Sequence, residues 1–200
     1  MKHSALKFMA ILATTVSFSA NAEIYKLDES HTQVGFKVKH LVISTVSGRF
    51  NKFNGNFDYN DKTNEISNLK VTISTDSIDT NEPDRDKHLK SSDFFDVTKF
   101  PAMEFVSKKT IVKNKKPVAL VGDLSIRGIK KEIKLTIETF GKTKDPWGNQ
   151  RIAFEANSKL DRKYFDLKWN KNLDQGGVMI SDEVKLVLEG EAILQTEEKK

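Results

Sequence analysis

Apolar side chains recur at every second position over most of this chain, and that period of two constrains its fold more than any other feature. The alternation is clear over residues 34–38, 69–73, 120–126, 133–137, 152–156 and 184–194. Successive side chains of a strand point to opposite faces, so alternation predicts strands with one buried and one exposed face. The sequence therefore predicts an antiparallel arrangement of consecutive strands.

Turn-forming residues separate these strands. Residues 60–64 read Asn-Asp-Lys-Thr-Asn, residues 127–128 read Arg-Gly, and residues 145–148 read Asp-Pro-Trp-Gly. Each combination suits a tight turn, because glycine and asparagine tolerate positive φ and proline fixes the first turn position. Short connections of this kind indicate a succession of hairpins.

Only residues 83–89 and 173–178 look helical, and both stretches are too short to cross between parallel strands. About eight antiparallel strands must close on themselves or form a sandwich to protect their edges. We therefore predict an all-β fold, an extended eight-stranded antiparallel barrel with one or two short helices. At about 3.4 Å per residue, ten-residue strands give a barrel roughly 30 Å tall.

The first 22 residues follow a different pattern. Lys2 and Lys7 precede an apolar stretch over residues 8–18, and Ala20-Asn21-Ala22 fits a cleavage site. This order predicts a secretory signal peptide, residues 1–22, cleaved after Ala22. The stretch is well short of the roughly 20 apolar residues that cross a bilayer, so we expect no transmembrane segment.

The remaining chain divides into a barrel domain, residues 23–195, and a charged tail, residues 196–200, that we expect to be disordered. Loss of Lys2 and Lys7 lowers the net charge from +5 to +3, and the charges are spread along the chain. We therefore expect no nucleic-acid partner. The chain has no cysteine, which excludes disulfides and a lipidated N-terminal cysteine. These features favour a bacterial periplasmic location.

The order of several motifs along the chain resembles the YceI family of bacterial periplasmic proteins. The motifs are residues 27–36 (LDESHTQVGF), 46–50 (VSGRF), 77–81 (SIDTN), 85–89 (RDKHL), 93–96 (DFFD), 100–101 (FP) with Phe105, 122–128 (GDLSIRG), 145–148 (DPWG) and 161–165 (DRKYF). The resemblance covers residues 23 to about 194. It implies a lipocalin-like barrel that binds polyisoprenoid or related long-chain lipids, without catalysis and with a possible homodimer.

The pattern alone leaves two alternatives for the barrel interior, because eight strands enclose a space that side chains just fill or that holds one slender ligand. The resemblance favours a lumen for the tail of a polyisoprenoid, a prenyl diphosphate or an isoprenoid quinone. The predicted lining is Phe36, Val38, Phe53, Phe57, Leu69, Val71, Phe105, Leu124, Ile126, Leu135 and Phe154.

A polar head group needs partners at the barrel mouth, and Arg49, Arg85, His88 and Arg162 are the candidates. Arginine presents a fork suited to phosphate, and histidine can donate to phosphate or to a carbonyl. The alternative, that Arg85 and His88 only tie a short helix to its neighbours, stays open. His31 is expected to make a hydrogen bond at a turn or strand end.

The sequence indicates no catalytic residues, no metal site and no cofactor. It contains no G-x-S-x-G, no glycine-rich phosphate loop and no H-E-x-x-H. The histidines His31, His40 and His88 lack the spacing of a helical zinc site, although distant residues can converge in a barrel. Three alternatives to a lipid carrier remain: a structural or stress-related protein without cargo, a metal-binding protein, and a hydrolase that uses the carboxylates of residues 76–96.

Overall fold

The computed structural model describes residues 22–174 and 176–195. Most of the expected signal peptide and the whole expected tail lie outside these residues. The strands are β1 (Glu23–Leu27), β2 (Gln33–His40), β3 (Ser44–Phe50), β4 (Phe53–Asn60), β5 (Glu65–Ser74), β6 (Ile78–Asp79), β7 (Ala102–Lys113), β8 (Lys116–Ile126), β9 (Ile129–Lys144), β10 (Gln150–Asp161) and β11 (Ile180–Leu194). The helices are η1 (Glu29–His31), η2 (Thr75–Ser77), α1 (Pro83–Lys90) and η3 (Arg162–Phe165).

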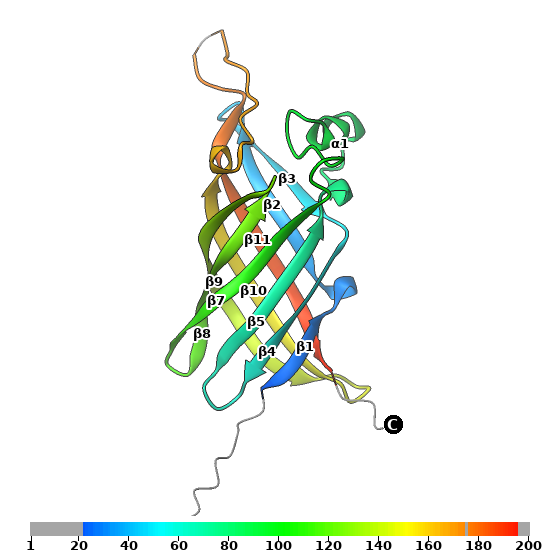
Figure 1. Ribbon diagram of the computed structural model, residues 1–200, viewed down its shortest axis with the longest axis vertical. Helices are drawn as coiled ribbons and strands as arrows, with labels where there is room; N and C mark the ends of the chain where they lie inside the picture. Colours follow the sequence, from blue (N-terminus) through cyan, green and yellow to red (C-terminus); the bar gives the residue numbers. More distant parts are fainter. Residues whose placement is uncertain (1–21, 175, 196–200) are drawn as a thin grey trace, which may run out of the picture.

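The strands close into one barrel (Figure 1). The hydrogen-bonded order is β1-β4-β5-β7-β8-β9-β10-β11, and β11 returns to pair with β1. The strands β1 and β2 form one strand of the ring, which is interrupted at η1. The strands β3 and β4 form a second one, which is interrupted at residues 51–52. Every pairing is antiparallel, which confirms the predicted eight-stranded antiparallel barrel.

The interruption at η1 packs directly against β11. Thr32 donates its hydroxyl to the Glu191 carbonyl at 3.1 Å and accepts from the Glu191 N–H at 3.2 Å. A β-carbon at Gly190 would overlap the Thr32 side chain, so only glycine allows this approach. The sequence thus bends the first strand of the ring without opening the sheet.

Loops and α1 gather at one end of the barrel, beside the ends of β2, β3 and β10 (Figure 1). Glu82 caps α1 by accepting from the Asp84 and Arg85 backbone N–H groups at 3.2 and 2.6 Å, and Pro83 starts the helix. The expected helix over residues 83–89 is confirmed. Within the described ranges, no helix has the length and apolar character that crossing a membrane requires.

The segment over residues 173–178 is not helical, contrary to the second helix considered from the sequence. A bridge joins Asn172 to Val178, and Leu173 donates its N–H to the Gly177 carbonyl at 3.1 Å. Gly176 and Gly177 have φ of 86° and 94°, which a right-handed helix does not permit. Residue 175 lies outside the described residues. The segment therefore forms a turn that returns the chain to β11.

The core is a continuous cluster of inward-facing side chains, and Ile152 of β10 is fully buried within it, with 0% exposure. We predict that Ile152→Ala lowers the free energy of unfolding by about 2–5 kcal/mol, because the change leaves a cavity that the packed sheet cannot fill. Urea unfolding followed by circular dichroism measures the difference.

The matched control is Ile24→Ala, since Ile24 is 49% exposed on β1. It should change the free energy of unfolding by no more than about 0.5 kcal/mol. Equal losses for the two variants would contradict the assigned inward face of β10.

Candidate functional site

An apolar cavity of about 560 Å³ runs inside the barrel that the described residues form. Every strand of the closed ring contributes to its lining or to the packed wall around it. Ten residues predicted from the sequence line it: Phe36, Val38, Phe57, Leu69, Val71, Phe105, Leu124, Ile126, Leu135 and Phe154. The interior is therefore hollow, and whether these residues hold a ligand stays a prediction.

Phe53, the remaining predicted lining residue, does not reach the cavity. It is buried in the core cluster as the first residue of β4, directly after the interruption at residues 51–52. The period of two identified its inward face correctly, but periodicity does not show where along a strand the hollow part ends.

The structure also adds lining residues that the sequence reasoning did not include. Ile133, Ile137, Leu186 and Leu188 lie on β9 and β11 in the same alternation that identified the others. A further set comes from α1 and the loops: Leu89, Phe94, Phe95, Leu167, Trp169 and Met179. The strand residues could have been found from their period, whereas the loop residues carry no periodic signal.

The end of the barrel near the β4–β5 turn is closed by aromatic rings. Tyr25 stacks on Phe57 with centroids 5.6 Å apart, and Tyr59 contacts Phe140 at 5.1 Å. Tyr25 and Tyr59 are buried, with 0% and 3% exposure, and burial raises the pKa of both phenols. These rings form a floor below the cavity.

Lys142 of β9 covers this floor from outside. Its ammonium lies 5.6 and 5.3 Å from the ring centroids of Tyr25 and Tyr59, and it forms ion pairs with Asp61 at 2.7 Å and Glu23 at 3.2 Å. Burial alone would lower the pKa of Lys142, but hydrogen bonds with Asp61, Tyr25 and Glu23 outweigh it and raise that pKa. The lysine stays charged and holds the floor closed.

The opposite end, beside α1, is the open mouth. Most of the polar lining lies here: His40, Thr80, Asp84, Arg85, His88 and Arg162. Asp84 is exposed and also lines the cavity, so the cavity reaches solvent beside α1. The lumen therefore has one apolar closed end and one polar open end.

Arg85 lies at this mouth and is half-buried. It donates from Nε to the Thr80 hydroxyl at 2.7 Å and from Nη2 to the Thr80 carbonyl at 2.8 Å. Thr80 in turn donates its hydroxyl to the Asp86 carboxylate at 2.5 Å. Within the described part of the chain no carboxylate pairs with the Arg85 guanidinium, and these bonds use two of its five N–H donors.

His88 sits one turn of α1 further along and has polar and aromatic neighbours. Its Nε2 lies 2.9 Å from the Asp93 carboxylate. Its ring meets Phe94 and Trp169 edge-on, at centroid distances of 5.0 and 4.8 Å. His88 therefore joins α1 to the loops around the mouth while it also lines the cavity.

The other two head-group candidates, Arg162 and Arg49, bind groups of the protein itself. Arg162 is buried and donates to the carbonyls of Ser181 and Trp169, at 2.9 Å each, and of Leu167. Burial lowers the pKa of Arg162, against the opposing charge of Asp182. Although Arg162 lines the cavity, most of its donors hold the loop after η3 to β11.

Arg49 does not reach the cavity. It precedes the inward-facing Phe50 on β3, so it points outward, where it pairs with Asp79 of β6 at 3.1 Å. The expectation that Arg49 could meet a head group at the mouth is therefore wrong. Neighbouring residues of a strand point to opposite faces, and Phe50 takes the inward one.

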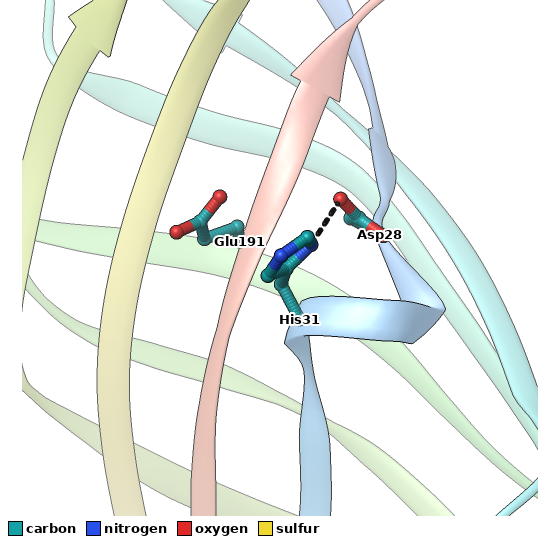
Figure 2. Close-up of side chains that lie close together, drawn as sticks. All are labelled: Asp28, His31 and Glu191. Carbon is teal, nitrogen blue, oxygen red and sulfur yellow. Dashed lines mark hydrogen bonds and ion pairs between the residues drawn. The ribbon is translucent and has the colours of Figure 1, made fainter. Parts of the chain in front are cut away.

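Asp28, His31 and Glu191 form a cluster on the outer wall (Figure 2). Among the described residues they are the one group whose spacing could suit a metal ion. The Arg151 guanidinium lies 2.7 Å from Asp28 and 2.8 Å from Glu191, however, and so supplies the positive charge that the two carboxylates share. The residues present do not fit a metal site.

The same cluster settles the expected role of His31. Its Nδ1 lies 2.9 Å from the Asp28 carboxylate, at the turn between β1 and β2, as the sequence suggested. Burial opposes the charge on Asp28, but hydrogen bonds from Ser30, Arg151 and His31 dominate and hold the pKa of that carboxyl well below its usual value. His31 is exposed on the outer wall, whereas His40 and His88 line the mouth of the lumen.

The chain matches the model of a protein family described as YceI-like domain, over residues 25–192. A UPF0312 protein of Vibrio vulnificus is 37% identical over 169 residues, which cover 84% of this chain and 89% of the relative. Protein YceI of Shigella flexneri is 36% identical over 192 residues, or 94% and 97% of the two chains.

Solved structures share the fold. A Campylobacter jejuni YceI protein aligns with a TM-score of 0.69 and 35% identity, covering 85% of this chain and 97% of the other. A polyisoprenoid-binding domain from Saccharophagus degradans aligns with a TM-score of 0.61 over 88% of this chain and 100% of the other. At 12% identity that second likeness shows the fold alone.

We predict that Arg151→Met destabilises the barrel at neutral pH, because Arg151 contacts Asp28, Asp145 and Glu191 together. Burial opposes ionisation of Asp145, but hydrogen bonds from Asn149 and Arg151 lower its pKa from 3.8 to about 2. A carboxyl with a lowered folded-state pKa stabilises the fold above its unfolded pKa and loses that effect as pH falls through the folded value. The urea midpoint of the variant should therefore lie below that of the parent at pH 7, with a difference that shrinks between pH 4 and pH 2.

Lys159→Met is the matched control, since Lys159 and Glu183 form an exposed ion pair. Its midpoint should follow that of the parent at each pH. A deficit of Arg151→Met that stays constant with pH would refute the electrostatic role.

Proposed function

The chain belongs to the YceI-like domain family, and we propose that it binds and carries one long-chain apolar lipid in the lumen of its barrel. The proposed cargo is a polyisoprenoid, a prenyl diphosphate or an isoprenoid quinone. The observation that carries the proposal is the apolar cavity of about 560 Å³, closed at one end and open at the other. This volume falls within the roughly 300–1,000 Å³ of small-molecule sites.

The shape of the lumen suits a chain that enters tail first. The floor of Tyr25, Phe57, Tyr59 and Phe140 is apolar on its inner side, whereas the mouth carries Arg85 and His88. A hydrocarbon end therefore meets only apolar side chains, and a polar head stays where hydrogen-bond donors and solvent are available. An interior filled by its own side chains would have supported the alternative of a structural barrel without cargo, whereas this interior is hollow.

The free energy of burial suggests that only the first few isoprene units of a long tail determine its affinity. Each buried CH₂ contributes about 0.8 kcal/mol, so a five-carbon isoprene unit contributes roughly 3–4 kcal/mol. Eight units would exceed the practical limit of about 18–21 kcal/mol, so the ordering of a flexible tail must offset much of the gain. We expect affinity to rise over the first few units and then to level off.

The periplasm is the proposed location, on the basis of the signal peptide that the sequence predicts over residues 1–22. A carrier is a reasonable role in that compartment, because free prenyl lipids do not cross an aqueous space unaided. We also propose that the protein acts without catalysis. The polar side chains of the mouth support this role, because Arg162 and Thr80 are engaged with backbone or neighbouring side chains.

We predict that Leu186→Trp prevents the lumen from binding its cargo. Leu186 lines the cavity from β11, and a larger side chain there fills space that the cargo needs. Binding of a labelled prenyl lipid should fall at least about tenfold, and co-purifying lipid should disappear from native mass spectra, while overpacking costs only about 1–3 kcal/mol of stability.

Lys185→Trp provides the control, because Lys185 is exposed on the outer face of the same strand. It should keep the cargo. The proposal fails if the parent protein from its native source shows only bare polypeptide and binds no labelled prenyl lipid.

We further predict that Arg85→Ala weakens binding of a prenyl diphosphate more than binding of the corresponding uncharged alcohol. Hydrogen bonds to a charged group contribute about 1.5–3 kcal/mol, so diphosphate affinity should fall roughly tenfold to a hundredfold. Competition against a labelled prenyl lipid measures both affinities.

Arg49→Ala is the matched control, since Arg49 faces away from the cavity. It should leave both affinities unchanged. If Arg85→Ala lowers the melting temperature and alters neither affinity, Arg85 serves only to hold α1 to Thr80.

A further inference from the structure

Exposed apolar side chains gather around the open mouth of the barrel. Among the described residues, four of the seven large apolar side chains that are exposed come from this end: Val42 at 74%, Ile43 at 85%, Tyr164 at 64% and Val178 at 38%. They belong to the β2–β3 turn, to η3 and to the loop before β11. We call these four residues the apolar rim.

The rim is continuous with the lumen. The β2–β3 turn is joined to the loop before β11, because Leu41 donates its N–H to the Met179 carbonyl at 2.8 Å. Just inside this contact, His40 pairs with Ile180, and both residues line the cavity together with Met179. An object that covers the rim therefore also covers the entrance to the cavity.

The backbone of the β2–β3 turn is held in a costly conformation. Leu41 and Val42 have φ of 51° and 66°, in the left-handed region that bulky and β-branched residues rarely adopt. Hairpin turns of this kind ordinarily use asparagine or glycine. Large apolar side chains therefore occupy a solvent-exposed turn where small polar residues would be less strained, and such local strain points to a function of the turn.

We propose that the apolar rim docks on an anionic lipid bilayer, so that the mouth of the lumen faces the membrane. The purpose of this docking, exchange of a lipid cargo, rests on the proposed function. Valine and isoleucine gain from leaving water for the acyl boundary, and a tyrosine such as Tyr164 suits the headgroup region.

The exposed lysines near the rim favour binding to an anionic surface. Lys37, Lys39 and Lys171 are exposed, and the described residues provide no ion pair to any of them. Asp174 on the same loop and Asp84 at the mouth are exposed acids, so these three lysines outnumber them by one. Basic groups near a bilayer are attracted to anionic headgroups over about a Debye length.

The shape of this end favours a membrane over a second copy of the chain. The loop that leads into β11 projects beyond the barrel, and the β2–β3 turn lies beside its base (Figure 1). A stable protein interface needs a continuous surface, about 1,200–2,000 Å² in total. A projecting loop buries little area against a second copy of the chain, whereas a fluid bilayer adapts to its shape.

The test is flotation of the mature protein with vesicles of phosphatidylcholine alone or mixed with phosphatidylglycerol. The parent protein should float with the mixed vesicles, and added salt should weaken this binding. The double variant Val42→Gly with Ile43→Ser should lower partitioning at least about tenfold. Glycine accepts the positive φ of residue 42, so the melting temperature should not fall, and binding of a labelled prenyl lipid in solution should stay unchanged.

Trp147→Ser is the matched control, because Trp147 is 82% exposed in the turn between β9 and β10, at the closed end. It should leave flotation unchanged. Three results would overturn the inference: no flotation of the parent protein, loss of flotation in Trp147→Ser instead, or a rim variant that converts a dimer into a monomer by light scattering without changing flotation.

The docking and the cargo can fail separately. Leu186→Trp should still float, because the rim remains intact when the lumen is filled. Flotation without any prenyl binding would refute the carrier function and leave the docking standing. Prenyl binding without flotation would refute the docking and leave the carrier function standing.

Discussion

Closure of the sheet between β1 and β11 is the constraint on which the rest of the structure depends. The pairing of β1 with β11 covers only Tyr25, Lys26 and Leu27, and the first strand of the ring then breaks at η1 before β2 resumes. An unclosed edge here would expose backbone groups and open the lumen sideways. The pairing of this strand with β11 is therefore interrupted at η1, between the β1 and β2 registers, and side chains reinforce this point.

That reinforcement comes from polar residues on the outer wall. The Asp28 N–H bonds the Glu191 carbonyl at 2.9 Å, Thr32 bonds both backbone groups of Glu191, and Arg151 joins Asp28, Asp145 and Glu191. The side chains of Arg151, Asp28 and Asp145 are only 14%, 12% and 7% exposed, and they are tolerated here because each charge has charge-assisted hydrogen-bond partners. The interior is thereby free to remain apolar, and a cluster that resembles a metal site is part of the wall.

Most of the fold could be predicted from the alternation of apolar and polar side chains in the sequence. Each long strand could be placed and its inward face assigned, because burial on one side of a sheet requires a period of two. The same rule misplaced Arg49, whose neighbour Phe50 takes the inward position, and it could not exclude Phe53 from the lumen. The glycines Gly176 and Gly177 were available as a signal against a helix over residues 173–178, since their positive φ ends helical geometry.

What periodicity cannot supply is the difference between the two ends. The floor depends on rings from β1, β4 and β9 that meet only after closure, and the mouth depends on loops that carry no repeat. Yet this difference gives the lumen a direction. Because Lys142 and its partners close one end and Arg85 stands at the other, a guest with one polar end has only one favourable orientation. In the proposed function its head would then lie beside the apolar rim, and the membrane that supplies the guest would itself cover the opening.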